Sequence, residues 1–219
     1  MLERALDPLN RAASLSANTL LAAASGDVLG SSLRILRRGE RLDANEGVVW
    51  FPVDAVVRAE TASGLLEGWT DRHGAIGLAE LLDRPESSTT WVVERSGEAL
   101  VTPASTVQAM LERSIGFQRA VMAWLVRSEH AARRRAAFNL TASAPEKVRR
   151  VVDFILSFHD GCAPITQEQV ATYTGIRRTT VCAAMGAMQA QGQIVVRRGK
   201  ILRPVTYSRT LDTGRGALL

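Results

Sequence analysis

The chain has 219 residues, of which 46% are apolar, and its mean hydropathy is +0.01. No apolar run approaches the roughly 20 residues of a membrane-spanning helix. The two cysteines, Cys162 and Cys182, argue against a disulfide framework, a zinc site or an iron–sulfur site, because they lack the spacing of such ligands. The N-terminus has no secretory signal pattern, so we expect a cytoplasmic protein with up to two modest domains.

The charge is distributed unevenly along the chain. Residues 1–132 carry 13 basic and 17 acidic side chains, a net −4, whereas residues 133–219 carry 14 and 5, a net +9. A mildly acidic module joined to a strongly basic one is typical of a sensor or assembly domain attached to a domain that binds a polyanion. The C-terminal part is therefore predicted to bind nucleic acid.

The N-terminal half begins with a helical pattern over residues 1–25, for which Ser14 and Ser16 are candidate caps. Short apolar runs then recur between turn signals from residue 29 to residue 102, and this spacing predicts a compact antiparallel barrel or sandwich. Pro52 is expected at a strand edge or bulge. The runs are LRIL, VVWFPV, AVVRAET, LLEGWT, AIGLAELL, TTWVVE and ALVT. The tryptophans expected in the core are Trp50, Trp69 and Trp91.

A long helix is predicted after this β region. Pro103 closes the strands, Thr102 or Ser105 is expected to cap a short helix to residue 111, and residues 114–140 form one helix about 40 Å long. Its apolar stripe predicts the seam of a parallel dimer, the alternative being burial within its own chain. The seam residues are Val121, Trp124, Leu125, Ser128 and Ala132. The cluster at residues 133–135 is interpreted as a solvated face rather than a DNA contact.

Residues 164–204 have the pattern of a winged helix-turn-helix. Thr166 and Gln169 form a capping box, as Ser143 and Glu146 do for the preceding helix. Gly175 permits the tight turn, and a second helix over residues 177–191 follows, with one apolar stripe. Alternation around Arg198 predicts a basic hairpin. The stripe consists of Val181, Ala184, Met185 and Met188, and the opposite face of Arg177, Arg178, Thr179, Cys182 and Ala183.

The stretch ITQEQVATYTGIRRTTVCAAMGAM resembles the helix-turn-helix of the cyclic-AMP receptor protein and FNR family, with weaker support from VVWFPVDAVV and AIGLAELL. The resemblance covers nearly the whole chain. It implies an α+β fold with an antiparallel β-roll (residues 1–112), a dimerisation helix (113–140), a winged helix-turn-helix (141–205) and a loosely ordered tail (206–219). The implied function is transcription regulation by a homodimer that binds a palindromic operator in double-stranded DNA.

The resemblance also implies which side chains would contact DNA. Arg178, Thr179 and Ala183 match base-contacting positions, and Thr166, Gln167 and Thr180 match backbone-contacting ones. The family's best-known member has a glutamate at the position of Thr179 and an arginine at that of Ala183, so a different half-site sequence is expected. Arg177 at the helix start and Arg197 and Arg198 in the hairpin are further candidates for phosphate contacts.

The effector region departs from the family pattern. Gly77 is followed by Leu78, with Glu80 two positions late, and the later stretch Glu86-Ser87-Ser88-Thr89-Thr90 has no arginine for a cyclic phosphate. The candidate effector-binding set is thus Gly77, Leu78, Glu80, Ser88 and Thr89. Because a buried phosphate needs a cationic partner, we expect no cyclic-AMP binding in the usual mode.

Three interpretations of the whole chain remain open at this stage. The first is a sensor whose β-roll binds another small molecule or a protein, and the second is an effector-independent repressor or architectural DNA-binding protein whose β-roll only supports dimerisation. The third, an enzyme, is disfavoured, because His159 and Cys162 have no orienting partner in the sequence. No cofactor or metal is expected, and neither is a membrane partner. RNA polymerase is a candidate partner at residues 159–163, which lie at the position of the family's polymerase-contacting loop.

Overall fold

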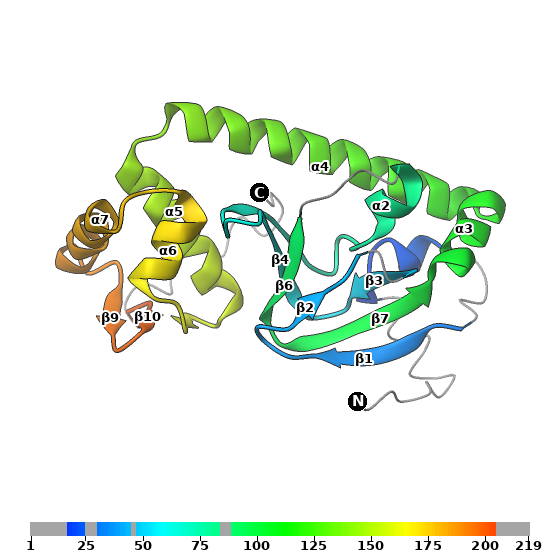
Figure 1. The fold of residues 1–219 in the computed structure, drawn as a ribbon, viewed down its shortest axis with the longest axis horizontal. Coiled ribbons are helices and arrows are strands. Elements are labelled where there is room, and N and C mark those ends of the chain that lie inside the picture. Colours follow the sequence, from blue (N-terminus) through cyan, green and yellow to red (C-terminus); the bar gives the residue numbers. More distant parts are fainter. Residues whose placement is uncertain (1–16, 25–29, 45–46, 84–88, 205–219) are drawn as a thin grey trace. The chain divides into compact units, whose positions relative to one another are not determined.

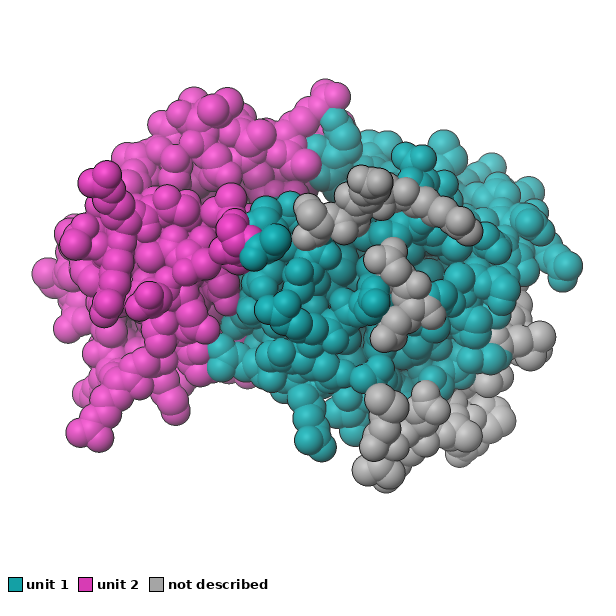
Figure 2. Space-filling model, in the orientation of Figure 1, with its two compact units in different colours: residues 1–62, 67–129 teal, residues 63–66, 130–219 magenta. Residues whose placement is uncertain are grey.

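The structure is a computed structural model that describes residues 17–24, 30–44, 47–83 and 89–204. The chain divides into two units, one of residues 1–62 and 67–129 and the other of residues 63–66 and 130–219 (Figure 2). Within the described ranges, no helix is long and apolar enough to cross a membrane.

The first unit contains two antiparallel sheets, labelled in Figure 1. One has the strand order β1-β7-β3 and the other the order β2-β6-β4-β5, so neighbours in each sheet are often far apart in sequence. The β1–β7, β3–β7, β2–β6 and β4–β6 pairings are all antiparallel. The bounds are β1 Ser32–Leu36, β2 Arg41–Leu42, β3 Val48–Pro52, β4 Val56–Glu60, β5 Leu66–Thr70, β6 Thr90–Arg95 and β7 Gly97–Pro103.

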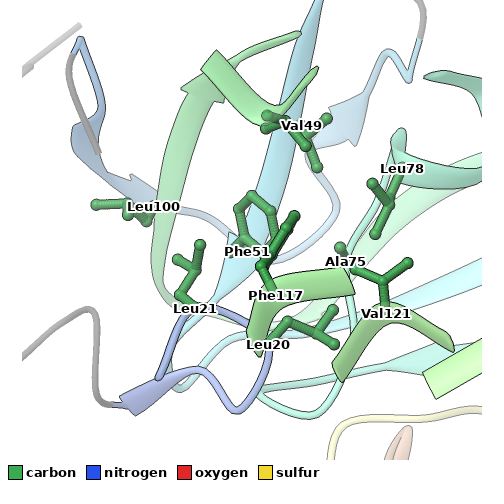
Figure 3. Close-up of a cluster of buried hydrophobic side chains, with 10 residues drawn as sticks. Leu20, Leu21, Val49, Phe51, Ala75, Leu78, Leu100, Phe117 and Val121 are labelled. Carbon is green, nitrogen blue, oxygen red and sulfur yellow. The ribbon is translucent and has the colours of Figure 1, made fainter. Parts of the chain in front are cut away.

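The core of this unit lies where these strands meet the surrounding helices. The 3-10 helix η1 (Leu21–Ala23), the helix α3 (Ala104–Arg113) and the first turns of α4 (Ile115–Thr141) contribute Leu21, Val107 and Phe117 to one buried cluster (Figure 3). A second cluster is built around Trp50, which is 1% exposed. Trp50 is therefore a core residue, as predicted, whereas Trp69 and Trp91 are only partly buried.

The predicted strand over AIGLAELL is wrong. Ile76 makes an isolated bridge to Trp50, and the chain then enters the helix α2 (Leu78–Asp83). Gly77 causes the change of direction, because its φ of +82° suits glycine and a Cβ there would lie 2.9 Å from the carbonyl oxygen of Val48. The run is apolar because its residues are buried: Ala75, Ile76 and Leu78 are all core residues.

The N-terminal helical lead-in is confirmed only as the short η1, since residues 1–16, with Ser14 and Ser16, lie outside the described residues. Asn18 holds this segment in place. Its side-chain nitrogen donates to the carbonyls of Pro52 (2.9 Å) and Gly74 (3.0 Å), and its side-chain oxygen accepts from the backbone of Leu20 at 3.0 Å. Asn18 is fully buried, so these bonds replace the water it loses.

The predicted caps of α3 are wrong. The residue at its N-cap is Pro103, which makes no side-chain capping bond. The Thr102 hydroxyl is instead within 3.0 Å of the Ser31 hydroxyl, a buried contact between sheet and N-terminal segment. The long helix predicted over residues 114–140 is confirmed as α4, which spans 27 residues.

In the described part of the second unit, the helices α5, α6 and α7 pack with a small sheet after the end of α4. Apolar residues of α5, α6 and α7 form its core, and the strand order of the sheet is β8-β10-β9. The sequence predicted the β9–β10 hairpin but not its third strand, β8. The bounds are α5 Ala144–Phe158, β8 Cys162–Ala163, α6 Gln167–Thr174, α7 Arg178–Ala190, β9 Val195–Arg197 and β10 Lys200–Leu202. The tail over residues 206–219 lies outside the described residues.

Candidate nucleic-acid interface

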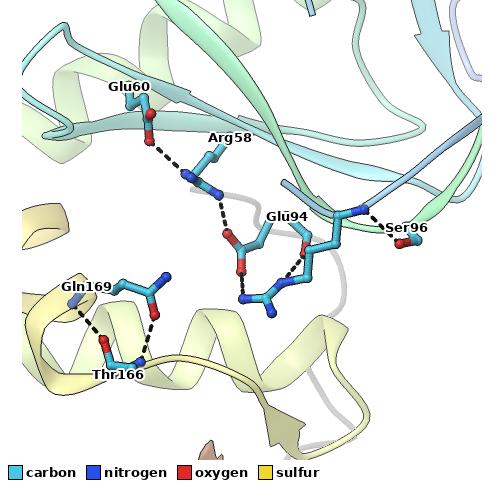
Figure 4. Close-up of polar contacts among 7 residues, drawn as sticks. Arg58, Glu60, Glu94, Ser96, Thr166 and Gln169 are labelled. Atoms are coloured by element: carbon cyan, nitrogen blue, oxygen red, sulfur yellow. Dashed lines mark hydrogen bonds and ion pairs between the residues drawn. The ribbon is translucent and has the colours of Figure 1, made fainter. Parts of the chain in front are cut away.

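The start of α6 is set by the predicted capping box. The Thr166 hydroxyl accepts from the backbone N–H of Gln169 at 3.2 Å, and the Gln169 side-chain oxygen accepts from the Thr166 N–H at 2.9 Å (Figure 4). The predicted box before α5 is also present, since the Ser143 backbone and hydroxyl both donate to Glu146. These bonds lower the pKa of the Glu146 carboxyl.

The turn between α6 and α7 depends on Gly175. This residue caps α6 in the left-handed conformation, with φ +65°, and its N–H points back to the carbonyls of Ala171 and Thr172. A side chain at this φ would be strained, which explains the glycine. Arg177 then occupies the N-cap position of α7.

Helix α7 has one face in the domain core and one in solvent. Val181, Ala184, Met185 and Met188 are buried, which confirms the predicted stripe. On the other face Arg177, Arg178, Thr179 and Ala183 are exposed, and Thr180 and Gln167 are partly exposed. The candidate base-contacting residues therefore share one accessible surface at the N-terminal half of α7. Whether they contact DNA stays a prediction.

Arg178 makes a weak, exposed ion pair with Glu168. Its guanidinium lies 3.5 Å from the Glu168 carboxylate, and both side chains are mostly exposed, at 66% and 73%. A surface ion pair of this kind contributes only about 0–1 kcal/mol. Arg178 can therefore turn toward an external acceptor at little energetic cost.

The wing is the β9–β10 hairpin, and its turn lies beside the start of α6. Its turn is formed by Arg198 and Gly199, both with positive φ (35° and 77°), which is the backbone a tight hairpin requires. A Cβ on Gly199 would lie 3.8 Å from the Thr166 methyl group, so the wing turn and the α6 N-cap are neighbours. Arg197 and Arg198 are exposed.

A contact that the sequence did not suggest links the two helices. The thiol of Cys182 on α7 is 3.1 Å from the side-chain oxygen of Gln167, the first residue of α6. The pairing has no sequence signal, because it depends on the angle at which the helices cross. It holds Gln167 at the edge of the exposed α7 face.

Of the candidate effector residues, the structure describes Gly77, Leu78, Glu80 and Thr89. Leu78 is fully buried in the core, and Glu80 is only partly buried on α2. The Thr89 hydroxyl donates to the Glu67 carboxylate at 2.8 Å, and Ser88 lies outside the described residues. The position of Gly77 is explained by the close approach of Val48 described above.

The same unit instead contains a buried ionic cluster on strands β4 and β6. The Glu94 carboxylate, whose side chain is 1% exposed, lies 2.6 Å from Arg58 and 3.4 Å from Arg38 (Figure 4). Arg58 also reaches Glu60 at 2.8 Å, and Arg38 donates to the Glu94 carbonyl at 3.1 Å. The cluster couples the turn after β1 to β6 and β4. Among the described residues no group of acidic, histidine and cysteine side chains has metal-site geometry.

The predicted dimer seam is divided between two faces of α4. Val121 is 3% exposed and Trp124 packs against the same core cluster, so both serve their own chain. Leu125, Ser128 and Ala132 are exposed. The most exposed apolar side chains of α4 are Ile115 (65%), Met122 (66%), Leu125 (40%), Val126 (55%) and Leu140 (87%). At about 100° per residue, this apolar face is rotated by roughly a quarter turn from the predicted stripe.

Comparisons with known proteins agree with this architecture. Residues 149–210 match the family described as the Crp-like helix-turn-helix domain. No curated protein sequence matches the chain.

Several solved structures share the fold. The c-di-GMP responsive global regulator CLP of Xanthomonas campestris is 13% identical, with a TM-score of 0.63 over 80% of this chain and 95% of its own. FixK2 of Bradyrhizobium japonicum is 15% identical, with a TM-score of 0.62 over 80% and 93%. A CRP/FNR-family regulator of Thermus thermophilus is 14% identical, with a TM-score of 0.54 over 78% and 93%.

Residues 149–210 thus match a Crp-like helix-turn-helix domain, and the part of the chain that the structure describes has the fold of solved Crp/FNR regulators. The solved structures with this fold are those of transcription regulators.

Proposed function

We propose that the protein binds a palindromic DNA operator as a homodimer, with one α7 helix in each half-site. The observation that supports this most directly is the exposed face of α7, where Arg177 and Arg178 flank the helix N-terminus. Backbone N–H groups and the helix dipole favour phosphate there, and arginine adds bidentate donors for guanine or phosphate. The exposed wing arginines extend the same positive surface.

The second copy is supported by α4. Its exposed apolar face repeats at seven-residue spacing from Ile115 to Met122, then continues through Leu125 and Val126. Apolar residues at such spacing favour packing against another helix. A symmetric pair of α4 helices would bury this face and place two α7 helices in one assembly.

The direct test is selection of genomic fragments with the purified full-length protein, followed by footprinting. The expected footprint is two-fold symmetric, with half-sites about 34–36 Å apart, one helical turn of DNA. An asymmetric footprint, or no protected fragment, would contradict the proposal.

Arg178→Ala is expected to relax base preference at one position of each half-site. A bidentate arginine–guanine pair contributes about 1–3 kcal/mol of discrimination, which is roughly 5- to 150-fold. Binding should be measured against the operator and against single-base variants of it. Arg197→Ala is the matched comparison, because loss of a wing phosphate contact should weaken all sequences equally. Equal base preference in wild type and Arg178→Ala would exclude base readout by Arg178.

Control by cyclic AMP in the usual mode is not part of the proposed function. Leu78 fills the core at the position where the family pattern has its ribose-binding glutamate, and no arginine lies in residues 86–90. Calorimetric titration of the purified protein with cyclic AMP should show no micromolar binding. Heat of binding that saturates at micromolar cyclic AMP would refute this expectation.

The alternative is effector-independent repression or DNA architecture, with the β-roll supporting dimerisation only. The buried ionic cluster around Glu94 agrees with this alternative, since the Glu94 carboxylate has its cationic partners within the protein. The two functions differ in one observable. Tight operator binding by purified protein at cellular salt favours the alternative, and binding that needs added cell extract favours a sensor of a small molecule or protein. RNA polymerase contact at residues 159–163 remains part of the proposal for an activator.

A further inference from the structure

Three arginines come together where α4 meets α5. Arg134 and Arg135 precede Phe138 by four and three residues, so they lie on the same side of α4 as its ring. The Arg150 guanidinium, from α5, lies over that ring with its carbon 4.3 Å from the centroid. The aromatic contact therefore places Arg150 next to the two arginines of α4. We refer to Arg134, Arg135 and Arg150 as the elbow cluster.

The charges that lower the pKa values of Arg135 and Arg150 are those of neighbouring arginines. Burial, then the charges of Arg150 and Arg134, lower the pKa of Arg135. Burial, then Arg134, lower the pKa of Arg150. Arginine stays protonated despite such shifts, because its ordinary pKa lies far above neutral pH. Three cations are thus held close together against their mutual repulsion.

The nearest carboxylates along α5 are engaged elsewhere. Glu146 accepts both hydrogen bonds from Ser143, and the arginine whose charge acts on it is Arg149. Asp153 lies 3.8 Å from Arg203. Burial raises the pKa of Asp153, and the charges of Arg203 and Arg149 oppose this. These carboxylates therefore leave the positive charge of the elbow cluster available to an external anion.

We propose that the elbow cluster binds a backbone phosphate of DNA, outside the contacts made by α7 and the wing. The inference rests on the proposed DNA-binding function. The cluster belongs to the same unit as α7, residues 63–66 and 130–219, so it accompanies the recognition helix onto DNA. Arg134 is exposed and Arg135 and Arg150 are partly buried, which makes an open surface suited to a polymer rather than an enclosed pocket for a free ion. Guanidinium groups fit phosphate geometry, and the stacked Arg150 is already ordered.

The test is the salt dependence of DNA binding by the full-length protein. In Arg134→Gln/Arg150→Gln, the slope of log K against log salt should become less steep by about 0.9 for each lost phosphate contact. Affinity should fall by the same factor for the selected operator and for unrelated DNA, because phosphate contacts carry no base information. The matched control is Arg72→Gln/Arg113→Gln, which removes the same charge from exposed positions of the other unit and should leave the slope unchanged.

Stability provides an independent readout. Removing two mutually repelling cations should leave the melting temperature unchanged or raise it, whereas a fall of several degrees would identify the cluster as structural and overturn the proposal. The proposal would also be overturned if the wild type binds DNA and the double variant shows the same salt slope as the wild type. A third result would overturn the proposal by assigning the cluster to a free anion. In that case inorganic pyrophosphate would raise the melting temperature of the wild type but not of the double variant, and the salt slope of DNA binding would be the same in both. If the wild type binds no DNA at all, the proposed function itself fails.

Discussion

Met122→Glu/Leu125→Glu is expected to convert the proposed dimer to a monomer and to lower affinity for the proposed two-half-site operator by about 10²- to 10⁴-fold. Met122 and Leu125 are 66% and 40% exposed on one face of α4. Glutamates there would place like charges across a two-fold seam, where the water that solvates them is excluded. The second recognition helix then no longer binds at the high effective concentration that a linked pair provides.

The oligomeric state should be measured by analytical ultracentrifugation, and operator binding by titration of the same preparation. Leu82→Glu is the matched control, because Leu82 is an equally exposed apolar residue (46%) on α2 rather than on α4. A double variant that stays dimeric would show that this face is not the seam. A monomeric variant that keeps wild-type operator affinity would instead show that tight operator binding does not need two linked α7 helices.

Glu94→Ala is expected to lower the free energy of unfolding by about 3–5 kcal/mol. The carboxylate is almost completely buried and contacts two guanidinium groups, Arg58 at 2.6 Å and Arg38 at 3.4 Å. Its removal takes the closest carboxylate from Arg58, whose side chain is only 15% exposed and also pairs with Glu60. Breaking one partner of a buried ionic group costs far more than losing a surface pair, because the remaining charge stays desolvated.

Urea denaturation of the full-length protein measures this loss. Glu67→Ala is the matched control, since Glu67 is exposed and accepts one hydrogen bond, from Thr89, so its loss should cost under about 1 kcal/mol. A Glu94→Ala variant as stable as Glu67→Ala would show that the ionic cluster does not hold β4 and β6 together.

Local signals account for the features that were correctly predicted from sequence. The Thr166–Gln169 capping box, the left-handed Gly175 and the apolar stripe of α7 each depend on residues within a few positions of one another. Such patterns survive in any tertiary context that accepts the helix. This is why the helix-turn-helix could be predicted.

Features that depend on distant partners were predicted less well. The apolar character of AIGLAELL is shared by buried strands and buried helices, so it does not distinguish the two. The close approach of Val48 to Gly77 sets the turn after which the segment forms the helix α2. Thr102 was expected to cap α3 but contacts Ser31, 71 positions away. The short strand β8 was missed because only its pairing with β10 defines it.

The sequence by itself determined the winged helix-turn-helix, the arginines at the start of its second helix and the lack of an arginine in residues 86–90, because each depends on residues close together in the chain. The tertiary structure alone decided which face of α4 is occupied by its own core. Val121 and Trp124 pack inward against residues from across the chain, which leaves Met122 and Leu125 exposed. It alone also brought Arg58 and Glu94 together from strands 36 positions apart, and Arg150 onto Phe138. Periodicity shows that a helix has an apolar side, but only packing shows which apolar residues are already covered.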